Sequence, residues 1–267
     1  MQLKSLLLLS QVFLAGASAL FYGKDTAVIN LTPSTFGSEI IDTNHTSIVE
    51  FYAEWCGHCQ NLKPHYIKAA SSLKGVVKVA SVRCDDDFAK PLCEKYNIKG
   101  FPTIKVFRPN AKSPKNPYIE DYHGQRTAKA IVDYVLPKIQ NRVKRLKPEG
   151  LEKWLNEFEI PKVLLLSDKQ NTPSMLKSLA VDYADVLAFA TINGAGKDVL
   201  AKYHVKKAPA LVVINGDQVT NYSGPLKNEP IYDFLSGIAT PSEGPKAFKN
   251  TQKLKKKNKK KTGREEL

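Results

Sequence analysis

The chain has 267 residues, enough for about two domains that each bury a core. Its hydrophobic content of 42% and charged content of 25% are those of an ordinary globular protein, which excludes a disordered or collagen-like chain. The net charge of +14 would suit nucleic-acid binding, but much of it lies in the tail from Lys246 to Arg264. We interpret this tail as a solvated spacer, not as a nuclear signal or a nucleic-acid arm.

The first 19 residues are typical of a secretory signal peptide. Lys4 precedes an apolar core, residues 5–14, and an A-x-A cleavage pattern follows at residues 17–19. A membrane anchor is the alternative, but the apolar run is shorter than the ~20 residues that a spanning helix needs. No later segment is long and apolar enough to span, so we expect a protein without a membrane span in an oxidising compartment. Three N-x-[ST] sequons are candidate glycosylation sites in such a compartment: Asn30, Asn44 and Asn221.

After the signal peptide, the chain alternates predicted strands and helices in the order βαβαβαββα. A short strand at residues 28–31 leads into a helix that Thr32 is placed to cap. The elements that follow are a strand at 47–53, a helix at 60–73, a strand at 76–83, a helix at 88–96, strands at 103–107 and 118–122, and a helix at 127–139. Pro64 lies inside the second helix and is predicted to kink it.

Residues 141–148 form a predicted basic linker, after which a second run of elements begins. The predicted elements are helices at 150–158, 173–183, 198–203 and 228–238 and strands at 162–166, 187–192, 208–214 and 218–222. Asn215-Gly216 indicates a hairpin turn between the last two strands. Because this order echoes the first run, we predict an internal repeat. The second run contains no cysteine, so it cannot carry out dithiol chemistry.

Cys56 and Cys59 are separated by two residues and follow the β-rich run at 47–53. A bare CxxC is ambiguous between a redox pair and half of a zinc site. Neither a second CxxC nor a closely spaced histidine pair is present in the sequence to complete a zinc site. Cys56 is predicted to lie at a helix N-terminus, where the partial positive charge and the free N–H groups favour the thiolate. We interpret the pair as redox-active and expect no metal.

Two motifs in this order carry a family resemblance: VEFYAEWCGHC at residues 49–59 and GFPT at residues 100–103. Together with the order of elements, they closely resemble the catalytic domain of the protein disulfide isomerase family. The resemblance implies an α/β fold class with two tandem thioredoxin-like domains, the first redox-active and the second redox-inactive, as in small fungal-type members. The expected organisation is a signal peptide at 1–19, a catalytic domain at 24–141, an inactive domain at 148–240 and a basic disordered tail at 241–267.

The resemblance also implies a role for each catalytic residue. Cys56 would attack a substrate disulfide as a thiolate, and Cys59 would resolve the mixed disulfide that forms. His58 would stabilise the thiolate, and potentials in the family lie near about −180 mV, against about −270 mV for thioredoxin. Glu50 lies in an apolar strand, where burial raises a carboxyl pKa, and it would shuttle a proton to and from Cys59. Arg126 would swing toward Cys59 and lower its pKa.

Further positions are assigned in the same way. Residues expected to contact substrate surround the dithiol in the family: Trp55, Gly57, Phe101 and Pro102. Pro102 would be the cis-proline that faces the two sulfurs. Cys84 and Cys93 would form a structural disulfide that contributes ~2–3 kcal/mol, with a regulatory or second redox pair as the alternative.

Two positions depart from the family pattern. Glu54 stands where most members have proline, and its negative charge would disfavour the Cys56 thiolate. Ser81 stands where a lysine often pairs with the buried glutamate, so Glu50 lacks that partner for the proton relay.

The predicted function is that of a thiol–disulfide oxidoreductase and isomerase. It would act as a monomer on unfolded or misoxidised secretory proteins and need no cofactor, because an endoplasmic reticulum oxidase or glutathione recharges the dithiol. Endoplasmic reticulum chaperones are further expected partners, whereas nucleic acid is not. The last four residues, REEL at 264–267, resemble KDEL/HDEL retrieval signals and indicate the endoplasmic reticulum lumen. The alternatives are a thioredoxin-like reductase, a chaperone or adaptor with secondary redox activity, and a basic nucleic-acid-binding protein.

Overall fold

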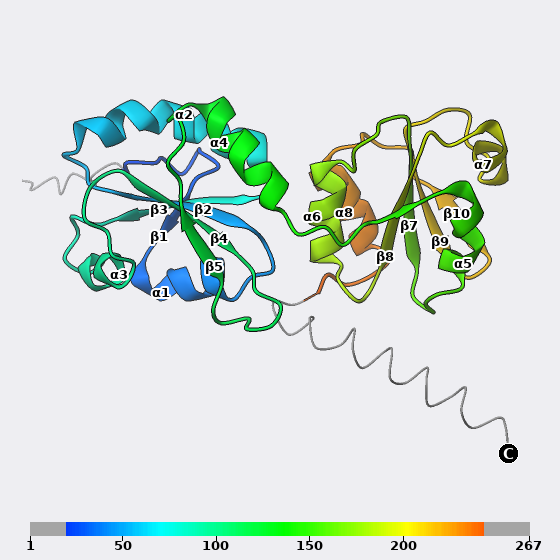
Figure 1. The fold of residues 1–267 in the computed structure, drawn as a ribbon, viewed down its shortest axis with the longest axis horizontal. Helices are drawn as coiled ribbons and strands as arrows, with labels where there is room; N and C mark the ends of the chain where they lie inside the picture. Colours follow the sequence, from blue (N-terminus) through cyan, green and yellow to red (C-terminus); the bar gives the residue numbers. More distant parts are fainter. Residues whose placement is uncertain (1–19, 243–267) are drawn as a thin grey trace, which may run out of the picture.

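The computed structural model of the chain describes residues 20–242, which form two α/β units (Figure 1). Each unit is built on a five-stranded sheet with helices on both faces. The predicted signal peptide and retrieval-like C-terminus, and the tail beyond Ser242, lie outside the described residues. Over residues 20–242, none of the helices has the length and apolar character required to cross a membrane.

The first unit has the predicted order of elements. Its strands are β1 (Ile29–Leu31), β2 (Ser47–Tyr52), β3 (Lys78–Arg83), β4 (Thr103–Arg108) and β5 (Tyr118–Asp121). Its α-helices are α1 (Pro33–Phe36), α2 (Gly57–Leu73), α3 (Lys90–Lys95) and α4 (Ala128–Val135). The strands are ordered β1-β3-β2-β4-β5; β3 is parallel to β1 and β2, and β4 is antiparallel to β2 and β5. Consequently β2, which leads into the cysteine pair, is the central strand.

Both faces of the central strand β2 are covered. Ile48 and Tyr52 face the core that α2 and α4 form with the sheet, whereas Val49 and Phe51 face the core on the side of α1 and α3. Because successive side chains of a strand point to opposite faces, Glu50 shares the face of Ile48 and Tyr52. The sequence therefore directs this carboxyl group into the core beneath α2.

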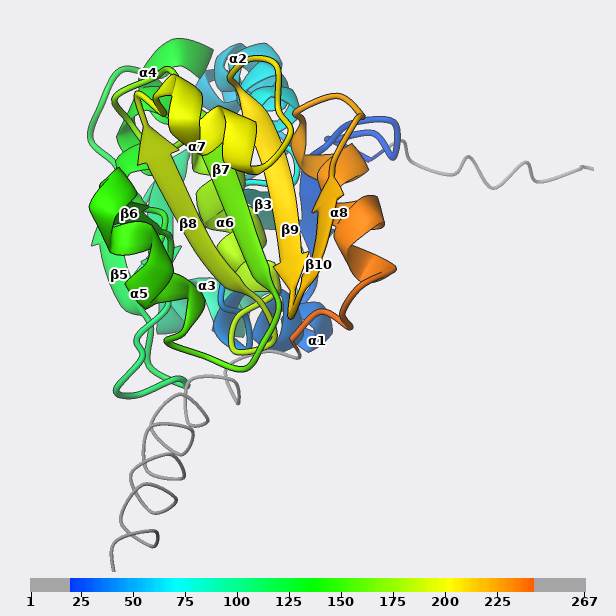
Figure 2. The same ribbon diagram turned by 90° about the vertical axis from the view of Figure 1, so that its right-hand side faces the viewer.

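The second unit repeats the first. Its strands are β6 (Lys144–Leu146), β7 (Lys162–Ser167), β8 (Ala188–Asn193), β9 (Ala210–Asn215) and β10 (Gln218–Asn221). Its α-helices are α5 (Leu151–Leu155), α6 (Ser174–Asp182), α7 (Lys197–Lys202) and α8 (Asn228–Ser236). The order β10-β9-β7-β8-β6 reproduces that of the first sheet, and Figure 2 shows α5 and α7 on one face with α6 and α8 on the other. A cis peptide bond precedes Pro102 before β4 and Pro209 before β9. The expected pair of tandem thioredoxin-like folds is confirmed.

Two boundaries differ from the sequence-based prediction. The linker predicted at 141–148 contains β6, which pairs in parallel with β8. This strand escapes pattern analysis because it has three residues, of which only Leu146 is buried. At the other end, Phe21 and Tyr22 are buried in the first core, so that unit begins before the predicted residue 24.

The two units are joined by a short connection and by direct contacts. Ile139 is buried in the first core and Val143 in the second. Side chains of α6 reach the first unit: Ser178 Oγ donates to the carbonyl of Gly75 at 2.7 Å. His45 Nε2 lies 2.8 Å from Asp182 Oδ1 at the end of the same helix. The α6 face of the second unit therefore packs toward the first.

We predict that the disulfide between Cys84 and Cys93 stabilises the first unit. The structure joins these residues across the loop between β3 and α3, and both are buried beside the sheet. Replacing both by alanine should lower the free energy of unfolding by about 2–3 kcal/mol, because the unfolded chain regains the entropy of a short loop. Urea unfolding of the oxidised proteins measures this difference. With all disulfides reduced in both proteins, most of the difference should disappear; an unchanged midpoint in the oxidised state would contradict the prediction.

Candidate active site

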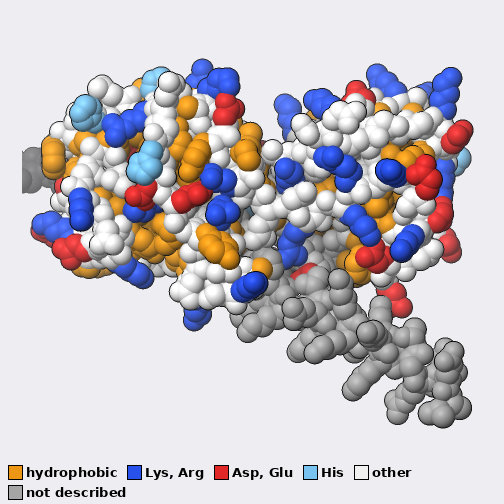
Figure 3. All heavy atoms as spheres, in the orientation of Figure 1, with side chains coloured by type: hydrophobic (Ala, Val, Ile, Leu, Met, Phe, Trp, Pro, Cys, Tyr) orange, Lys and Arg blue, Asp and Glu red, His pale blue; other side chains and the backbone are white. Residues whose placement is uncertain are grey.

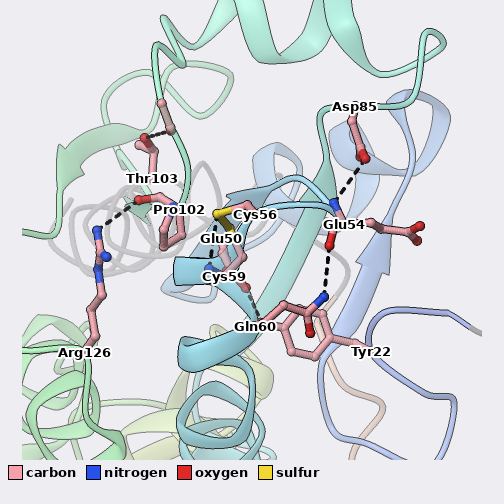
Figure 4. The surroundings of a disulfide bond; sticks show 11 residues. Tyr22, Glu50, Glu54, Cys56, Cys59, Gln60, Asp85, Pro102, Thr103 and Arg126 are labelled. Carbon is pink, nitrogen blue, oxygen red and sulfur yellow. Dashed lines mark hydrogen bonds between the residues drawn. A yellow bond between two sulfur atoms is a disulfide. The ribbon is translucent and has the colours of Figure 1, made fainter.

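The cysteine pair forms a disulfide at the start of α2 (Figure 4). Cys56 is the N-cap residue, and its Sγ accepts a hydrogen bond from the backbone N–H of Cys59 at 3.2 Å. This N–H and the positive end of the helix stabilise a thiolate on Cys56, so its predicted place at a helix N-terminus is confirmed. Cys56 is only 6% exposed, because it is held against the core, and Cys59 is fully buried. Of the two sulfurs, Cys56 is the one a substrate can reach.

The expected substrate-contacting residues line the rim of this site. Trp55 is 75% exposed, and its ring meets that of Phe101 edge-to-face with 5.9 Å between centroids. Gly57 and His58 are also exposed, and a side chain at Gly57 would meet open space. Pro102 is buried and follows a cis bond, as predicted. In Figure 4, Pro102 lies on one side of the disulfide and Glu54 on the other.

Glu50 is fully buried, and one of its oxygens has a hydrogen-bond donor. The hydroxyl of Tyr22 donates to Glu50 Oε2 (Figure 4). Burial raises the pKa of Glu50 from 4.5 to about 7, and the Tyr22 hydrogen bond and the charge of Arg126 partly oppose this rise. The expected elevated pKa is thus found. Within residues 20–242, no group donates a hydrogen bond to the other oxygen, Oε1.

Arg126 lies near the cis-proline in this structure. Its Nη2 donates to the carbonyl of Pro102 at 3.5 Å, the long limit for a hydrogen bond, and the side chain is exposed. The guanidinium is therefore directed at the segment that faces the dithiol (Figure 4). From this position its charge still favours the ionised form of Glu50.

Glu54, whose negative charge we expected to disfavour the Cys56 thiolate, has a cationic partner in Arg83. Its carboxylate lies 2.9 Å from Arg83 Nη1, and Arg83 Nε in turn donates to Asp85 at 3.0 Å. Asp85 closes the network by accepting from the backbone N–H of Glu54 at 3.1 Å. In Figure 4 the Glu54 side chain points away from the sulfurs. Because the pair with Arg83 is partly exposed, its effect is to offset charge more than to add stability.

Ser81 does not take the place of the missing lysine. It lies opposite Glu50 in the register of β2 and β3, but its hydroxyl donates to Asn30 Oδ1 at 3.4 Å. The donor to Glu50 is Tyr22, which our sequence analysis missed because it precedes the predicted domain start. The signal was present as an aromatic pair, Phe21-Tyr22, just after the cleavage pattern.

The candidate glycosylation sites differ in accessibility. Asn221 is exposed on β10, and Asn30 is half-buried on β1. Asn44 is only 5% exposed, which makes it the least accessible of the three candidate sites. Asn44 lies in the segment that leads into β2, next to His45, which contacts Asp182 of the second unit.

Among the residues that the structure describes, no group of three or more His, Cys, Asp or Glu side chains is arranged to hold a metal ion. The redox centre is the cysteine pair itself. The CxxC disulfide follows the central strand, caps the next helix and faces a cis-proline loop. These features define the class of protein: a thioredoxin-like redox domain followed by a second unit with the same topology.

Comparison with known proteins agrees with this class. The Thioredoxin family model matches residues 27–136. Protein disulfide-isomerase MPD1 of Saccharomyces cerevisiae is 40% identical over 185 residues, which are 65% of this chain and 58% of that protein. The protein disulfide-isomerase A6 homolog of Drosophila melanogaster is 48% identical over 142 residues, 53% of this chain and 31% of that protein. Residues 27–136 therefore form a Thioredoxin domain, and the chain is similar to proteins named protein disulfide-isomerase over half or more of its length.

The similarity is partial in length. The chain spans less than two thirds of the curated relatives that it matches. Among solved structures, the Trx4 domain of ERdj5 is 35% identical with a TM-score of 0.39, and the match covers 43% of this chain and 97% of that domain.

We predict that Glu50 makes stability fall as the pH rises. Below about pH 4.5 the carboxyl group is protonated in the folded and the unfolded chain alike. Between about pH 4.5 and about pH 7 the unfolded chain releases a proton that the folded chain retains, so the free energy of unfolding decreases. Above about pH 7 the loss reaches about 3 kcal/mol.

Urea unfolding across this pH range measures the effect. Glu50→Gln should remove the dependence, so its stability relative to the original protein should improve by about 3 kcal/mol from about pH 4 to about pH 8. Glu54→Gln makes the same chemical change on the surface and should follow the original protein. Parallel curves for Glu50→Gln and the original protein would contradict a raised pKa.

Proposed function

We propose that this protein is a thiol–disulfide oxidoreductase that forms and rearranges disulfides in secretory proteins. The observation that carries the proposal is the Cys56–Cys59 disulfide, which caps α2 with one sulfur at the surface edge and the other fully buried. Because the two sulfurs differ in exposure, we assign attack on the substrate to Cys56 and resolution of the mixed disulfide to Cys59. The relatives named protein disulfide-isomerase support this assignment.

The exchange proceeds through a mixed disulfide. When the dithiol reduces or rearranges a substrate, the Cys56 thiolate attacks one substrate sulfur, and the other leaves as a thiolate. Cys59 then attacks Cys56, closes the protein disulfide and releases the second substrate sulfur. Oxidation of a substrate is the reverse: a substrate thiolate attacks Cys56, and Cys59 leaves with the electron pair of the broken bond.

The buried sulfur requires a proton donor and acceptor. Cys59 has no exposure, so a thiolate there is costly unless its charge is neutralised. Glu50 lies on the sheet face packed against α2, and its pKa of about 7 lets it gain or lose a proton near neutral pH. We assign Glu50 as the proton shuttle for Cys59. Arg126, which donates to the carbonyl of Pro102, lowers the pKa of Glu50 through its positive charge.

The rim residues are assigned to substrate binding. The exposed ring of Trp55, packed on Phe101, offers an apolar platform to an unfolded chain. Gly57 leaves the approach to Cys56 open, and the chain around Pro102 provides the opposing wall. His58, exposed between the cysteines, is placed to stabilise the Cys56 thiolate.

The partners and the location belong to the same proposal. We assign the protein to the endoplasmic reticulum lumen, with unfolded or misoxidised secretory proteins as substrates and endoplasmic reticulum chaperones as partners. An oxidase of that compartment or glutathione recharges the dithiol. The predicted signal peptide, the REEL terminus and the second, buried disulfide support an oxidising compartment. We place the catalytic domain between Phe21 and about residue 141 and the inactive domain between Lys144 and about residue 240.

We predict different failures for the two cysteine variants. Cys56→Ser should abolish reactivation of a reduced, unfolded ribonuclease, because no thiolate remains to start the exchange. Cys59→Ser should accumulate mixed disulfides with the substrate, because the resolving sulfur is missing. Reactivation assays and non-reducing gels with mass mapping measure both effects. The variant Cys84→Ala, Cys93→Ala should retain activity; a Cys56→Ser, Cys59→Ser protein that reactivates the ribonuclease as well as the original would refute the proposed function.

The equilibrium potential distinguishes an isomerase from a reductase. Because the positive charge of Arg83 offsets part of the negative charge near Glu54, we expect a value near about −180 mV in glutathione buffers, read by alkylation of Cys56 and Cys59. A value near about −270 mV would instead assign the protein to reduction. Arg83→Leu, which leaves Glu54 uncompensated, should shift the potential toward the reducing side, because a less stable thiolate disfavours the dithiol.

A further inference from the structure

Tyr22 is held rigidly beneath the active site. Its side chain is fully buried, and its ring contacts those of Phe21, Tyr52 and Tyr66 with 5.0, 5.8 and 5.7 Å between centroids. Its backbone carbonyl accepts a hydrogen bond from Asn30 Nδ2 at 2.8 Å. Neither the ring nor the backbone needs Glu50 to stay in place, so the hydroxyl is a preset donor.

The surroundings of Glu50 contain several polar groups, but their hydrogen bonds go elsewhere. Tyr66 of α2 donates to the backbone carbonyls of Ile48 and Ala80, and Ser81 of β3 donates to Asn30. Arg126, from the loop before α4, donates to the carbonyl of Pro102. Tyr52 of the same strand and the cysteine pair at the start of α2 are further titratable groups in this core, as are Tyr122 and Tyr134. Among the described residues, Tyr22 is the donor to the carboxyl group.

We propose that Tyr22 is a positioning residue for proton transfer between Glu50 and Cys59. Its hydrogen bond holds Oε2 and leaves Oε1, which has no donor in the described part of the chain, as the oxygen that exchanges the proton. The inference rests on the proposed function and adds a component to it. Tyr22 thereby takes the part of a charged partner that this chain lacks at Ser81.

The step in which Tyr22 participates can be written in full. In the mixed disulfide, the Cys59 thiol gives its proton to Glu50 Oε1, and the Cys59 thiolate attacks Cys56. The Cys56–Cys59 bond forms, the bond from Cys56 to the substrate sulfur breaks, and the substrate leaves as a thiolate. In the reverse direction, Glu50 returns the proton to Cys59 as that sulfur leaves. Tyr22 keeps its own proton throughout.

A neutral donor suits this task better than a cation. A lysine beside Glu50 would strongly favour the ionised carboxylate, whereas the phenol does so only in part. Burial raises the pKa of Tyr22, so the hydroxyl stays protonated and remains a donor across the working pH range. Glu50 can therefore take up a proton near neutral pH while its orientation is fixed.

The test is the pH profile of the resolving step in Tyr22→Phe. The reduced protein is mixed with saturating oxidised glutathione, and Trp55 fluorescence follows the intramolecular attack of Cys59 on glutathionylated Cys56. Loss of the donor raises the pKa of Glu50 further, so less carboxylate is present at low pH. The acid limb of the profile should move upward by about one pH unit, with a rate about tenfold lower near pH 6 and rates that converge at alkaline pH.

Matched variants separate this role from a structural one. Tyr66→Phe removes an equally buried hydroxyl that bonds the backbone, and it should leave the acid limb in place. In a Glu50→Gln background, Tyr22→Phe should have no further effect on the profile. A uniform slowing at every pH, an unmoved acid limb, or an effect that persists without Glu50 would each overturn the proposal.

A second variant keeps the test decisive if Tyr22→Phe does not fold. Placing 3-fluorotyrosine at position 22 preserves the shape of the ring and strengthens the hydroxyl as a donor. The acid limb should then move to lower pH, and an unchanged limb would overturn the proposal. If the original protein shows no glutathione-dependent step that requires Cys56 and Cys59, the proposed function itself fails; if it does and only these profiles stay unmoved, Tyr22 alone loses its role.

Discussion

The hydrogen bond from Tyr22 to Glu50 ties the first described segment of the chain to the central strand of the first sheet. It also reduces the cost of a carboxyl group that strand alternation directs into the core. Without this donor, the pKa of the carboxyl group would be higher still. In the proposed proton transfer, this bond therefore helps to set the pH range in which the buried sulfur, Cys59, reacts.

Around Cys56, at the outer half of the site, charge is likewise stabilised by neighbouring groups. Cys56 draws on backbone dipoles at the start of α2, and the nearest unusual charge, Glu54, is offset by Arg83. Asp85 links this offset to the backbone before the cysteines and lies next to the second disulfide. The loop between β3 and α3 is thus part of the support of the active site, although it contributes no reacting atom.

Apart from β6, the order of elements in both units could be predicted from sequence, because these elements carry local signals. Thr32 and Pro33 mark a helix start and the buried run of β2 marks a central strand, whereas the cis bond before Pro102 was expected from the family resemblance. Tyr22 could not be predicted, because its partner is 28 positions away and no periodicity relates them. The strand β6 was missed because its pairing with β8, not its composition, makes it a strand. The burial of Asn44 likewise depends on tertiary packing.

The connection between the units limits how they can rearrange. Ile139 and Val143 are anchored in different cores, and the chain between these two anchors can extend to at most about 14 Å. The contact of Ser178 with Gly75 further restrains movement about this connection, so the units cannot separate like domains on a flexible tether. Any movement of the second unit would consequently be a swivel over a short arc, with its distance from the first unit nearly constant.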